Sequence, residues 1–359
     1  MKPNYSLFFI LVVIAFACKK ETIEPATGEP SVTVEAIGNC YGNSWTAAPD
    51  YEGCYNSPCL VYNNKAYFFN KLVEPTSNPY NRTVTIFDGV NWETKPSDVP
   101  LPYSQFGNDH FWFTIGNKGY IGRSSNPGFG YPKWLYEYDF AANTWTEKAE
   151  FEGPGRYESS FFSVGNKGYV VGGQQGGSLP HLNDTWEYNP SNNSWTQKAS
   201  IPNFGRYSGT GFSIGNKGYI VNGLISVTNG TNPPYDFYLN DLYEYNPANN
   251  TWTGKAPFPG EPRRRTKAFV ISGNAYVGGG SDGSDQLIDF YKYSPESNTW
   301  GEIADFTFTS TNYSKTNGFS INSKGYIVWP GYSTPKIQKY TPRYCVNLPT
   351  TSVVNNSGN

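Results

Sequence analysis

The chain repeats one pattern six times, at intervals of about 50 residues. A tyrosine after a short turn marks each copy, and a tryptophan recurs at the same interval. The tyrosines are Tyr67, Tyr120, Tyr169, Tyr219, Tyr276 and Tyr326, and the tryptophans are Trp45, Trp92, Trp145, Trp195, Trp252 and Trp300. A repeat of this length is one supersecondary unit that buries its apolar face only against its neighbours, which favours a propeller or a solenoid.

Each copy has the pattern of two β-hairpins. In the third copy, the β-prone residues 161–171 contain a central Gly-Asn turn, which tolerates positive φ angles. Residues 184–188 alternate between apolar and polar side chains and lead through an Asn- and Pro-rich turn into a further short strand at 194–196. The two hairpins supply four strands per copy, so we expect an all-β protein.

The composition agrees with this pattern and excludes some functions. The chain has 38 glycines and 27 prolines, 17% of its residues are aromatic, and only 16% are charged, against about 25% in ordinary globular proteins. The formal net charge is −2, so neither sign of charge dominates. We therefore expect no nonspecific binding of nucleic acid.

The repeats resemble Kelch repeats. The shared features are the turn followed by Tyr, an apolar pair and Gly-Gly, at Gly172-Gly173 and Gly279-Gly280, and the Tyr with a Trp seven residues later, as in Tyr188 and Trp195. The resemblance implies a six-bladed β-propeller with four-stranded antiparallel blades. The glycine pair is replaced by Asn70, Gly122-Arg123, Asn222-Gly223 and Trp329-Pro330-Gly331, so we expect irregular blades 1, 2 and 6 at this position.

The two ends of the repeat array complement one another. The sixth copy reaches Tyr340 and lacks its Trp strand, whereas residues 42–46, which include Trp45, have the sequence of that strand. We expect the N-terminal strand to complete the last blade, which leaves no open sheet edge in the ring. The propeller is predicted over residues 40–346, with a flexible tail at 347–359, as a monomer.

The first residues have the pattern of an export signal. Lys2 precedes eleven apolar residues at 7–17, fewer than the roughly 20 that span a membrane as a helix. Ala17-Cys18 resembles the lipobox of bacterial lipoproteins, although an ordinary secretory signal is the alternative. We expect a signal peptide at residues 1–17, a lipid anchor at Cys18, a polar tether at 18–39, and a location at the outer membrane, on its periplasmic or cell-surface side. Lys19-Lys20-Glu21 is similar to the export signal of surface lipoproteins in Bacteroidetes.

Four further cysteines allow three disulfide pairings. Cys40 precedes the closing strand and Cys345 follows its neighbour, so we expect these two to pair. Cys54 and Cys59 would then form the second bond. A zinc site is the alternative, but a four-thiol site normally has two close cysteine pairs and the chain has one. We expect disulfides, and neither a metal nor a cofactor.

The long loops after the second strand of each blade should share a face with the connectors between blades, and we expect any binding site there. The connectors carry the candidate ligand-binding residues Arg156, Arg206, Arg263, Arg264, Tyr157, Tyr207 and Tyr313. The arginines have two interpretations: they bind carboxylates or sugar hydroxyls, or they are structural and pair with carbonyls and acids such as Glu158. The recurring Asp184, Asp241 and Asp289 are expected to make turn hydrogen bonds.

The chain has no motif of a known catalytic class. His110 and His181 are its only histidines; Asp109-His110 is either an oriented base or a surface pair. We therefore expect a non-catalytic module that binds a glycan, a peptide or an envelope protein. The alternative is an enzyme, because the chain is similar to exported six-bladed sialic-acid mutarotases, and that resemblance implies catalysis by Glu158 with Arg206 or Arg156.

Overall fold

The computed structural model describes residues 39–49, 57–71, 82–97, 110–124, 133–175, 181–227, 235–306, 317–329 and 336–346. In these residues the strands form six four-stranded sheets and two two-stranded sheets. The chain divides into two compact units, and the second, Asn43–Thr341, contains all six four-stranded sheets.

Each four-stranded sheet is one blade of a propeller, and every pair of neighbouring strands is antiparallel. Blade 1 contains β3 (Cys59–Tyr62), β4 (Lys65–Lys71), β5 (Arg82–Phe87) and β6 (Trp92–Pro96); blade 2 contains β7 (His110–Ile115), β8 (Lys118–Arg123), β9 (Trp134–Asp139) and β10 (Thr144–Lys148). Blade 3 contains β11 (Ser160–Val164), β12 (Lys167–Gln174), β13 (His181–Asn189) and β14 (Ser194–Lys198); blade 4 contains β15 (Thr210–Ile214), β16 (Lys217–Val221), β19 (Leu242–Asn246) and β20 (Thr251–Lys255). Blade 5 contains β21 (Lys267–Ile271), β22 (Asn274–Gly278), β23 (Phe290–Ser294) and β24 (Thr299–Glu302); blade 6 contains β25 (Asn317–Ile321), β26 (Lys324–Trp329), β27 (Lys336–Thr341) and β2 (Ser44–Ala47).

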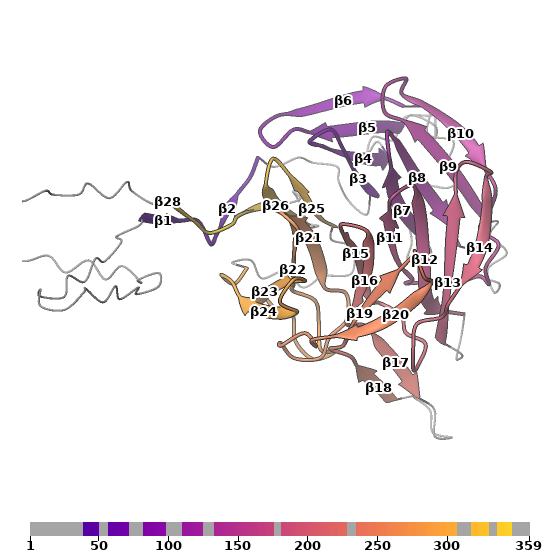
Figure 1. The fold of residues 1–359 in the computed structure, drawn as a ribbon. Coiled ribbons are helices and arrows are strands. Elements are labelled where there is room, and N and C mark those ends of the chain that lie inside the picture. Colours follow the sequence, from indigo (N-terminus) through magenta and orange to yellow (C-terminus); the bar gives the residue numbers. More distant parts are fainter. Residues whose placement is uncertain are drawn as a thin grey trace, which may run out of the picture. The chain divides into compact units, whose positions relative to one another are not determined.

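The ring closes as the sequence predicted. β2, from the N-terminal end of the described chain, pairs with β27 from the C-terminal end, and this register places Trp45 opposite Tyr340. Figure 1 shows the indigo strand β2 beside the yellow strands of the last blade. The first strands of neighbouring blades contact one another in the cyclic order β3, β7, β11, β15, β21, β25 and again β3. The prediction of six blades in one ring is confirmed.

Two two-stranded sheets lie outside the blades. β17 (Leu224–Val227) pairs with β18 (Tyr235–Tyr238) in the insertion between the second and third strands of blade 4. β1 (Asn39–Tyr41) pairs with β28 (Tyr344–Val346) in the other compact unit. No helix in the described ranges is long and apolar enough to cross a membrane.

The core lies between blades and is built mainly from rings. In blades 2 to 6 a phenylalanine of the first strand packs on the second strand of the next blade, and in blade 1 Leu60 takes its place. A Cβ atom on Gly168 would lie 2.2 Å from the ring of Phe113, and one on Gly218 would lie 2.0 Å from the ring of Phe162. Glycine before the repeated tyrosine makes room for this close approach in blades 2, 3, 4 and 6, whereas alanine, Ala66 and Ala275, stands at the same position in blades 1 and 5.

Repeated polar contacts join neighbouring blades at the outer edge of the ring. In four blades an asparagine in the outer turn has a positive φ angle, and its Oδ1 accepts from a tyrosine hydroxyl of its own blade and from an alanine N–H of the preceding blade. The tryptophan two residues later donates from Nε1 to the carbonyl of the same alanine. We call this arrangement the interblade clasp; its asparagines are Asn43, Asn193, Asn250 and Asn298. The tyrosine and the tryptophan that take part in each clasp are thus structural residues of the repeat.

Candidate functional site

The connectors and the long loops share one face of the propeller. In three successive blades, the residue after the connector arginine forms an antiparallel bridge with the end of the second strand or with the segment that follows it. The bridges are Tyr157 with Gln174, Tyr207 with Leu224, and Arg264 with Ser281. The predicted location of the variable loops is therefore correct for blades 3 to 5.

Gly173 explains why the repeat needs glycine at this face. Its φ angle is +105°, its N–H donates to the Arg206 carbonyl of the next blade at 2.7 Å, and a Cβ atom there would lie 2.7 Å from the Tyr157 carbonyl oxygen. Gly223 makes the equivalent bond to the Arg263 carbonyl at 2.9 Å. Asn222, with φ of +60°, takes the place of the first glycine there, so blade 4 keeps the geometry.

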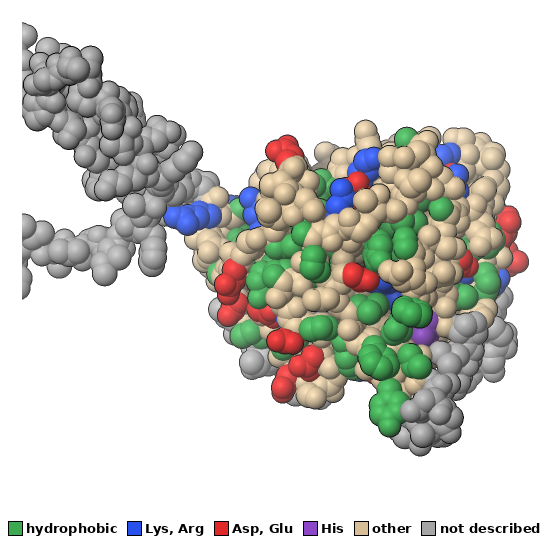
Figure 2. Space-filling model, turned by 60° about the horizontal axis from the view of Figure 1, so that its bottom comes forward, with side chains coloured by type: hydrophobic (Ala, Val, Ile, Leu, Met, Phe, Trp, Pro, Cys, Tyr) green, Lys and Arg blue, Asp and Glu red, His purple; other side chains and the backbone are tan. Residues whose placement is uncertain are grey.

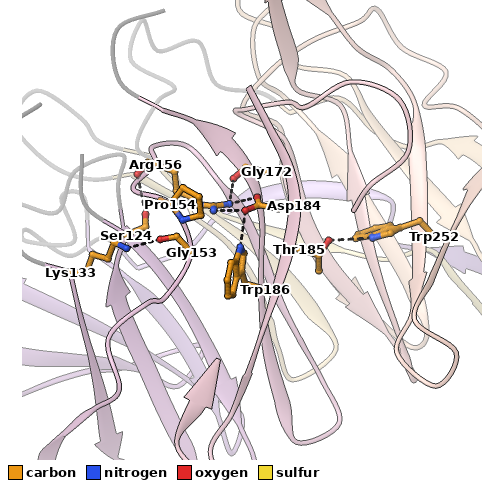
Figure 3. A network of polar contacts seen from close by, with 10 residues as sticks. All are labelled: Ser124, Lys133, Gly153, Pro154, Arg156, Gly172, Asp184, Thr185, Trp186 and Trp252. Atoms are coloured by element: carbon orange, nitrogen blue, oxygen red, sulfur yellow. Dashed lines mark hydrogen bonds and ion pairs between the residues drawn. The ribbon is translucent and has the colours of Figure 1, made fainter. Parts of the chain in front are cut away.

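Arg156 is fully buried and its guanidinium is held on several sides (Figure 3). Nη1 and Nη2 donate to the two carboxylate oxygens of Asp184 at 2.6 and 2.7 Å. Nη1 also donates to the Gly172 carbonyl at 2.8 Å, and Nε donates to the Pro154 carbonyl at 3.0 Å. The ring of Phe151 lies 4.9 Å from the guanidinium carbon. This bidentate pair ties the start of blade 3 to its third strand.

Arg206 and Arg263 repeat this contact in blades 4 and 5. Both are buried; Arg206 pairs with Asp241 and Arg263 with Asp289, each through two hydrogen bonds, with Nη2 donating at 2.8 Å. The aspartates therefore accept from arginine, and the turn role expected for them is wrong. For Arg156, Arg206 and Arg263, the geometry favours the structural interpretation, and their acid is aspartate instead of Glu158.

Arg264 differs from its neighbour Arg263. It is half-buried, its guanidinium carbon lies 5.8 Å from the centre of the Tyr238 ring, and it forms no ion pair with any described residue. Its Nε is buried without a hydrogen-bond partner. A partly desolvated guanidinium that has no anion of its own is available to bind one.

Glu158, Ser208 and Arg265 stand at the same position of blades 3, 4 and 5, and all three have positive φ angles, of +50°, +58° and +58°. Ser208 donates its hydroxyl proton to Oε2 of Glu158, and Arg265 Nη2 pairs with Oε1. Their backbones are also linked, because Ser208 N–H donates to the Glu158 carbonyl and Arg265 N–H to the Ser208 carbonyl. Left-handed conformations at non-glycine residues cost energy, and such residues cluster at functional sites.

Lys267 begins β21 two residues after Arg265. It is half-buried and forms no ion pair or hydrogen bond through its side chain with the residues that the structure describes. Burial, with a smaller contribution from the Arg265 guanidinium, lowers the pKa of Lys267 to about 7, while Glu158 acts in the opposite direction. The amine is therefore substantially neutral near physiological pH.

Next to this cluster, the β17–β18 hairpin brings Ser226 and Asp236 to Tyr207 and His181. The Tyr207 hydroxyl lies 3.0 Å from Ser226 Oγ, which donates to Asp236. His181 Nε2 accepts from the Ser226 backbone N–H at 2.7 Å, and its Nδ1 is buried without a partner. Burial lowers the pKa of His181 and raises that of Tyr207. Because the imidazole faces the amide and not the hydroxyl of Ser226, the group is not a serine-histidine catalytic pair.

The hairpin itself carries exposed apolar side chains. Val227 of β17 and Tyr235 and Phe237 of β18 are exposed, with Phe237 55% accessible. β17 and β18 lie at the bottom of Figure 1, and Figure 2, which brings that side forward, shows hydrophobic side chains gathered beside a histidine. The face therefore combines aromatic side chains with the guanidinium of Arg264, which forms no ion pair within the described ranges.

The remaining predicted residues are distributed as follows. Tyr157 is half-buried at its bridge, and His110, for which one interpretation was a surface location, is 7% exposed and packs on Trp134. Cys40 lies opposite Cys345 in the β1–β28 register, and their disulfide remains a prediction. Tyr313, Asp109, Cys54, Cys18, the signal peptide, most of the tether and the tail lie outside the described residues. No cluster of three metal-ligating side chains occurs in the part of the chain that could be searched.

Sequence reasoning paired Glu158 with Arg206 or Arg156, whereas the structure brings Glu158 to Ser208 and Arg265. The run Arg263-Arg264-Arg265 was visible, but the different roles of its members follow from alternating side-chain directions that the sequence does not give. Lys267 looked like any lysine at a strand end. Aligning the repeats would have placed Glu158, Ser208 and Arg265 at one position, and their different side chains there were the sequence signal for this contact.

The comparisons with known proteins agree with this fold. No curated protein matches the chain. The solved structure titled "Structure of YjhT" has 12% sequence identity and a TM-score of 0.58, over 84% of this chain and 98% of that one, which is a likeness of fold. The sequence model described as the Attractin/LZTR1 beta-propeller matches residues 120–347, most of the repeat array. The chain therefore belongs to the Attractin/LZTR1 β-propeller family.

Proposed function

We propose that this chain is a non-catalytic binding module whose loop face takes a carboxylate-bearing glycan, presented outside the cytoplasm on a lipid anchor at Cys18. A peptide or an envelope protein that offers an acidic side chain would satisfy the same cationic site. The propeller supplies a rigid frame, and the connectors of blades 3 to 5 supply the binding groups.

The contrast between Arg263 and Arg264 carries this proposal. Arg263 has its own carboxylate, from Asp289, whereas Arg264 lies over an aromatic ring with a buried Nε that has no partner. Binding of a carboxylate would complete the hydrogen bonds of Arg264, and the nearby Tyr207 and Tyr238 would contact the apolar face of a sugar.

The test is proton NMR of the purified full chain with free sialic acid, with neutral glucose for comparison. We expect line broadening of sialic acid by the wild-type protein and its loss in Arg264→Gln. Lys65→Gln, which removes an exposed charge from the β3–β4 turn, serves as the control and should leave broadening unchanged. Equal broadening by Arg264→Gln, or none with any acidic sugar or peptide, would refute the proposal.

A second function, sugar mutarotation, is favoured by the Glu158 carboxylate, which is fixed by Ser208 and Arg265 and lies close to Lys267. Mutarotation needs one group that takes the proton of the anomeric hydroxyl and another that protonates the ring oxygen. The same NMR samples test it, because catalysis would accelerate exchange between anomers and Glu158→Gln would abolish the acceleration. Line broadening without faster exchange between anomers would support binding and contradict mutarotation.

A further inference from the structure

The β17–β18 hairpin lies outside the ring of blades and has a free edge. The backbone groups of Leu224 and Ser226 in β17 point away from β18, because Leu224 pairs with the connector of blade 4 and the Ser226 N–H donates to a histidine ring. In the antiparallel register, Tyr238 lies opposite Leu224, and Asp236 lies opposite Ser226. The backbone N–H and C=O groups of Asp236 and Tyr238 therefore point away from β17, and none of the described residues forms a hydrogen bond with them.

The two faces of β18 differ in chemistry. Tyr235 and Phe237 are exposed on the outer face, and Tyr235 lies opposite the exposed Val227 of β17. Asp236, also exposed, and the half-buried Tyr238 lie on the inner face. A strand that pairs with this edge continues both faces, so it needs apolar side chains on one face and polar or charged side chains on the other.

The inner face carries an anion and a cation that do not meet within one copy. The guanidinium carbon of Arg264 lies 5.8 Å from the centre of the Tyr238 ring, and Arg264 forms no ion pair with any described residue. The Asp236 carboxylate accepts from the Ser226 hydroxyl and also forms no ion pair in the described ranges. A strand antiparallel to β18 that brings a carboxylate opposite Tyr238 would supply the missing anion.

We propose that the β18 strands of two copies of this chain pair antiparallel about a two-fold axis at Phe237. The residues Tyr235–Tyr238 alternate between the two faces in the pattern that the edge requires, with Asp236 as the acid. In this register Asp236 of each copy lies opposite Tyr238 of the other copy. Both opposite pairs exchange their backbone N–H and C=O hydrogen bonds, so the free groups of the edge are satisfied.

Charge selects this register. Residues directly opposite one another in an antiparallel pair have Cβ atoms about 4.5–5.5 Å apart, which brings the Asp236 carboxylate beside the ring on which Arg264 of the other copy packs. A two-fold axis at Asp236 would instead place two carboxylates directly opposite, and like charges there are destabilising. With the axis at Phe237, the two phenylalanine rings meet in a non-hydrogen-bonded pair, where side chains are closest.

The paired edge is short, because β18 has 4 residues. Such an interface is smaller than the roughly 1,200 Å² at which stable complexes begin, so we expect a weak and reversible dimer. This proposal replaces the expectation of a monomer. It uses the guanidinium of the proposed carboxylate site but does not rest on ligand binding, and an acidic ligand and the second copy would exclude each other at Arg264.

Sedimentation velocity of the purified full chain at increasing protein concentration is the test. We expect the mean mass to rise towards twice the mass of one chain. Asp236→Arg and Arg264→Asp should each weaken association by roughly tenfold or more, because each brings like charges together. An equimolar mixture of these two variants should associate like the wild type, since both contacts of the mixed dimer then join an arginine to an aspartate.

A second pair of variants tests the apolar face. Phe237→Lys should weaken association, whereas Val90→Lys, which also replaces an exposed apolar side chain but in the β5–β6 turn, should leave it unchanged. Both side chains are more than half exposed, at 55% and 67%, so neither substitution disturbs the core. Equal effects of the two would contradict pairing at β18.

The outcomes separate this inference from the proposed function. A single mass at every concentration overturns the dimer, and so does association that neither charge variant weakens. A mixture that does not regain association excludes this register. A single mass together with binding of a synthetic peptide of alternating glutamate and phenylalanine would overturn self-pairing and assign the edge to a foreign strand. Sialic acid line broadening is measured on the ligand itself, so its absence refutes the carboxylate site and leaves a measured dimer in place.

Discussion

The backbone N–H of Ala304 donates a hydrogen bond of 3.0 Å to Oδ1 of Asn43, across a sequence separation of 261 residues. Asn43 Oδ1 also accepts from the Tyr340 hydroxyl at 3.0 Å, and Trp45 Nε1 donates to the Ala304 carbonyl at 2.9 Å. The interblade clasp that joins internal blades thus also joins blade 5 to the N-terminal strand of blade 6.

Asn43→Ala should lower the free energy of unfolding of the propeller by about 1–3 kcal/mol, because it removes the acceptor of two hydrogen bonds and forces alanine into a positive φ angle. Urea unfolding followed by tryptophan fluorescence measures the change. Asn249→Ala, in an exposed turn, is the control and should change stability by less than about 0.5 kcal/mol. Equal effects of the two substitutions would contradict the role of the clasp.

Arg263 and Arg264 are adjacent but should respond differently to substitution. Arg263→Leu leaves the Asp289 carboxylate without its buried partner and should destabilise the fold by about 3 kcal/mol. Arg264→Gln breaks no ion pair of the described residues and should cost less than about 1 kcal/mol. Melting temperatures of the two variants, compared with the wild type, are the measurement. A larger loss for Arg264→Gln would reverse the assignment of structural and binding roles.

Buried tyrosines make the fold sensitive to alkaline pH. Burial raises the pKa of Tyr245 and of Tyr293 to about 12, from the ordinary tyrosine value of 10.0. Since the unfolded chain loses these protons first, the stability they contribute is complete below about pH 10 and falls as the pH rises towards 12. Unfolding free energies at increasing pH should show this decline. Tyrosinate absorbance from Tyr245 and Tyr293 at pH 10, before any unfolding, would contradict the prediction.

The β1–β28 register predicts a disulfide between Cys40 and Cys345. Peptide mapping of the exported protein under nonreducing conditions should find these two cysteines linked. Reduction should then lower the stability of the β1–β28 pairing without unfolding the blades, because the two strands belong to a separate compact unit. A Cys40–Cys54 link would show that the expected pairing is wrong.

The lipid anchor has its own test. Cys18→Ala should release the exported protein from membranes into the soluble fraction, because the residue that would carry the lipid is absent. Partition into detergent, compared between this variant and Cys59→Ala, is the measurement. Unchanged detergent partition of Cys18→Ala would exclude lipidation at this cysteine.

The fold could be predicted from the sequence because the same pattern of strands and turns occurs six times. Each Tyr, Trp and turn Asn recurs at one position, and the missing strand after Tyr340 identified the closing strand. The site was harder to predict because it depends on differences between copies. Glu158, Ser208 and Arg265 share one backbone conformation but have three different side chains, and their contacts join residues that are one and two repeats apart in the sequence.

The pairing of β2 with β27 sets the order in which the protein can be completed. Asn43 is synthesised early and its partner Tyr340 is 297 residues further along the chain, so blade 6 stays open at its edge until nearly the whole propeller sequence is present. A chain that stops short of β27 exposes unpaired strand edges, which favour aggregation. Closure therefore distinguishes complete from truncated chains, and only a complete chain gains the full stability of the ring.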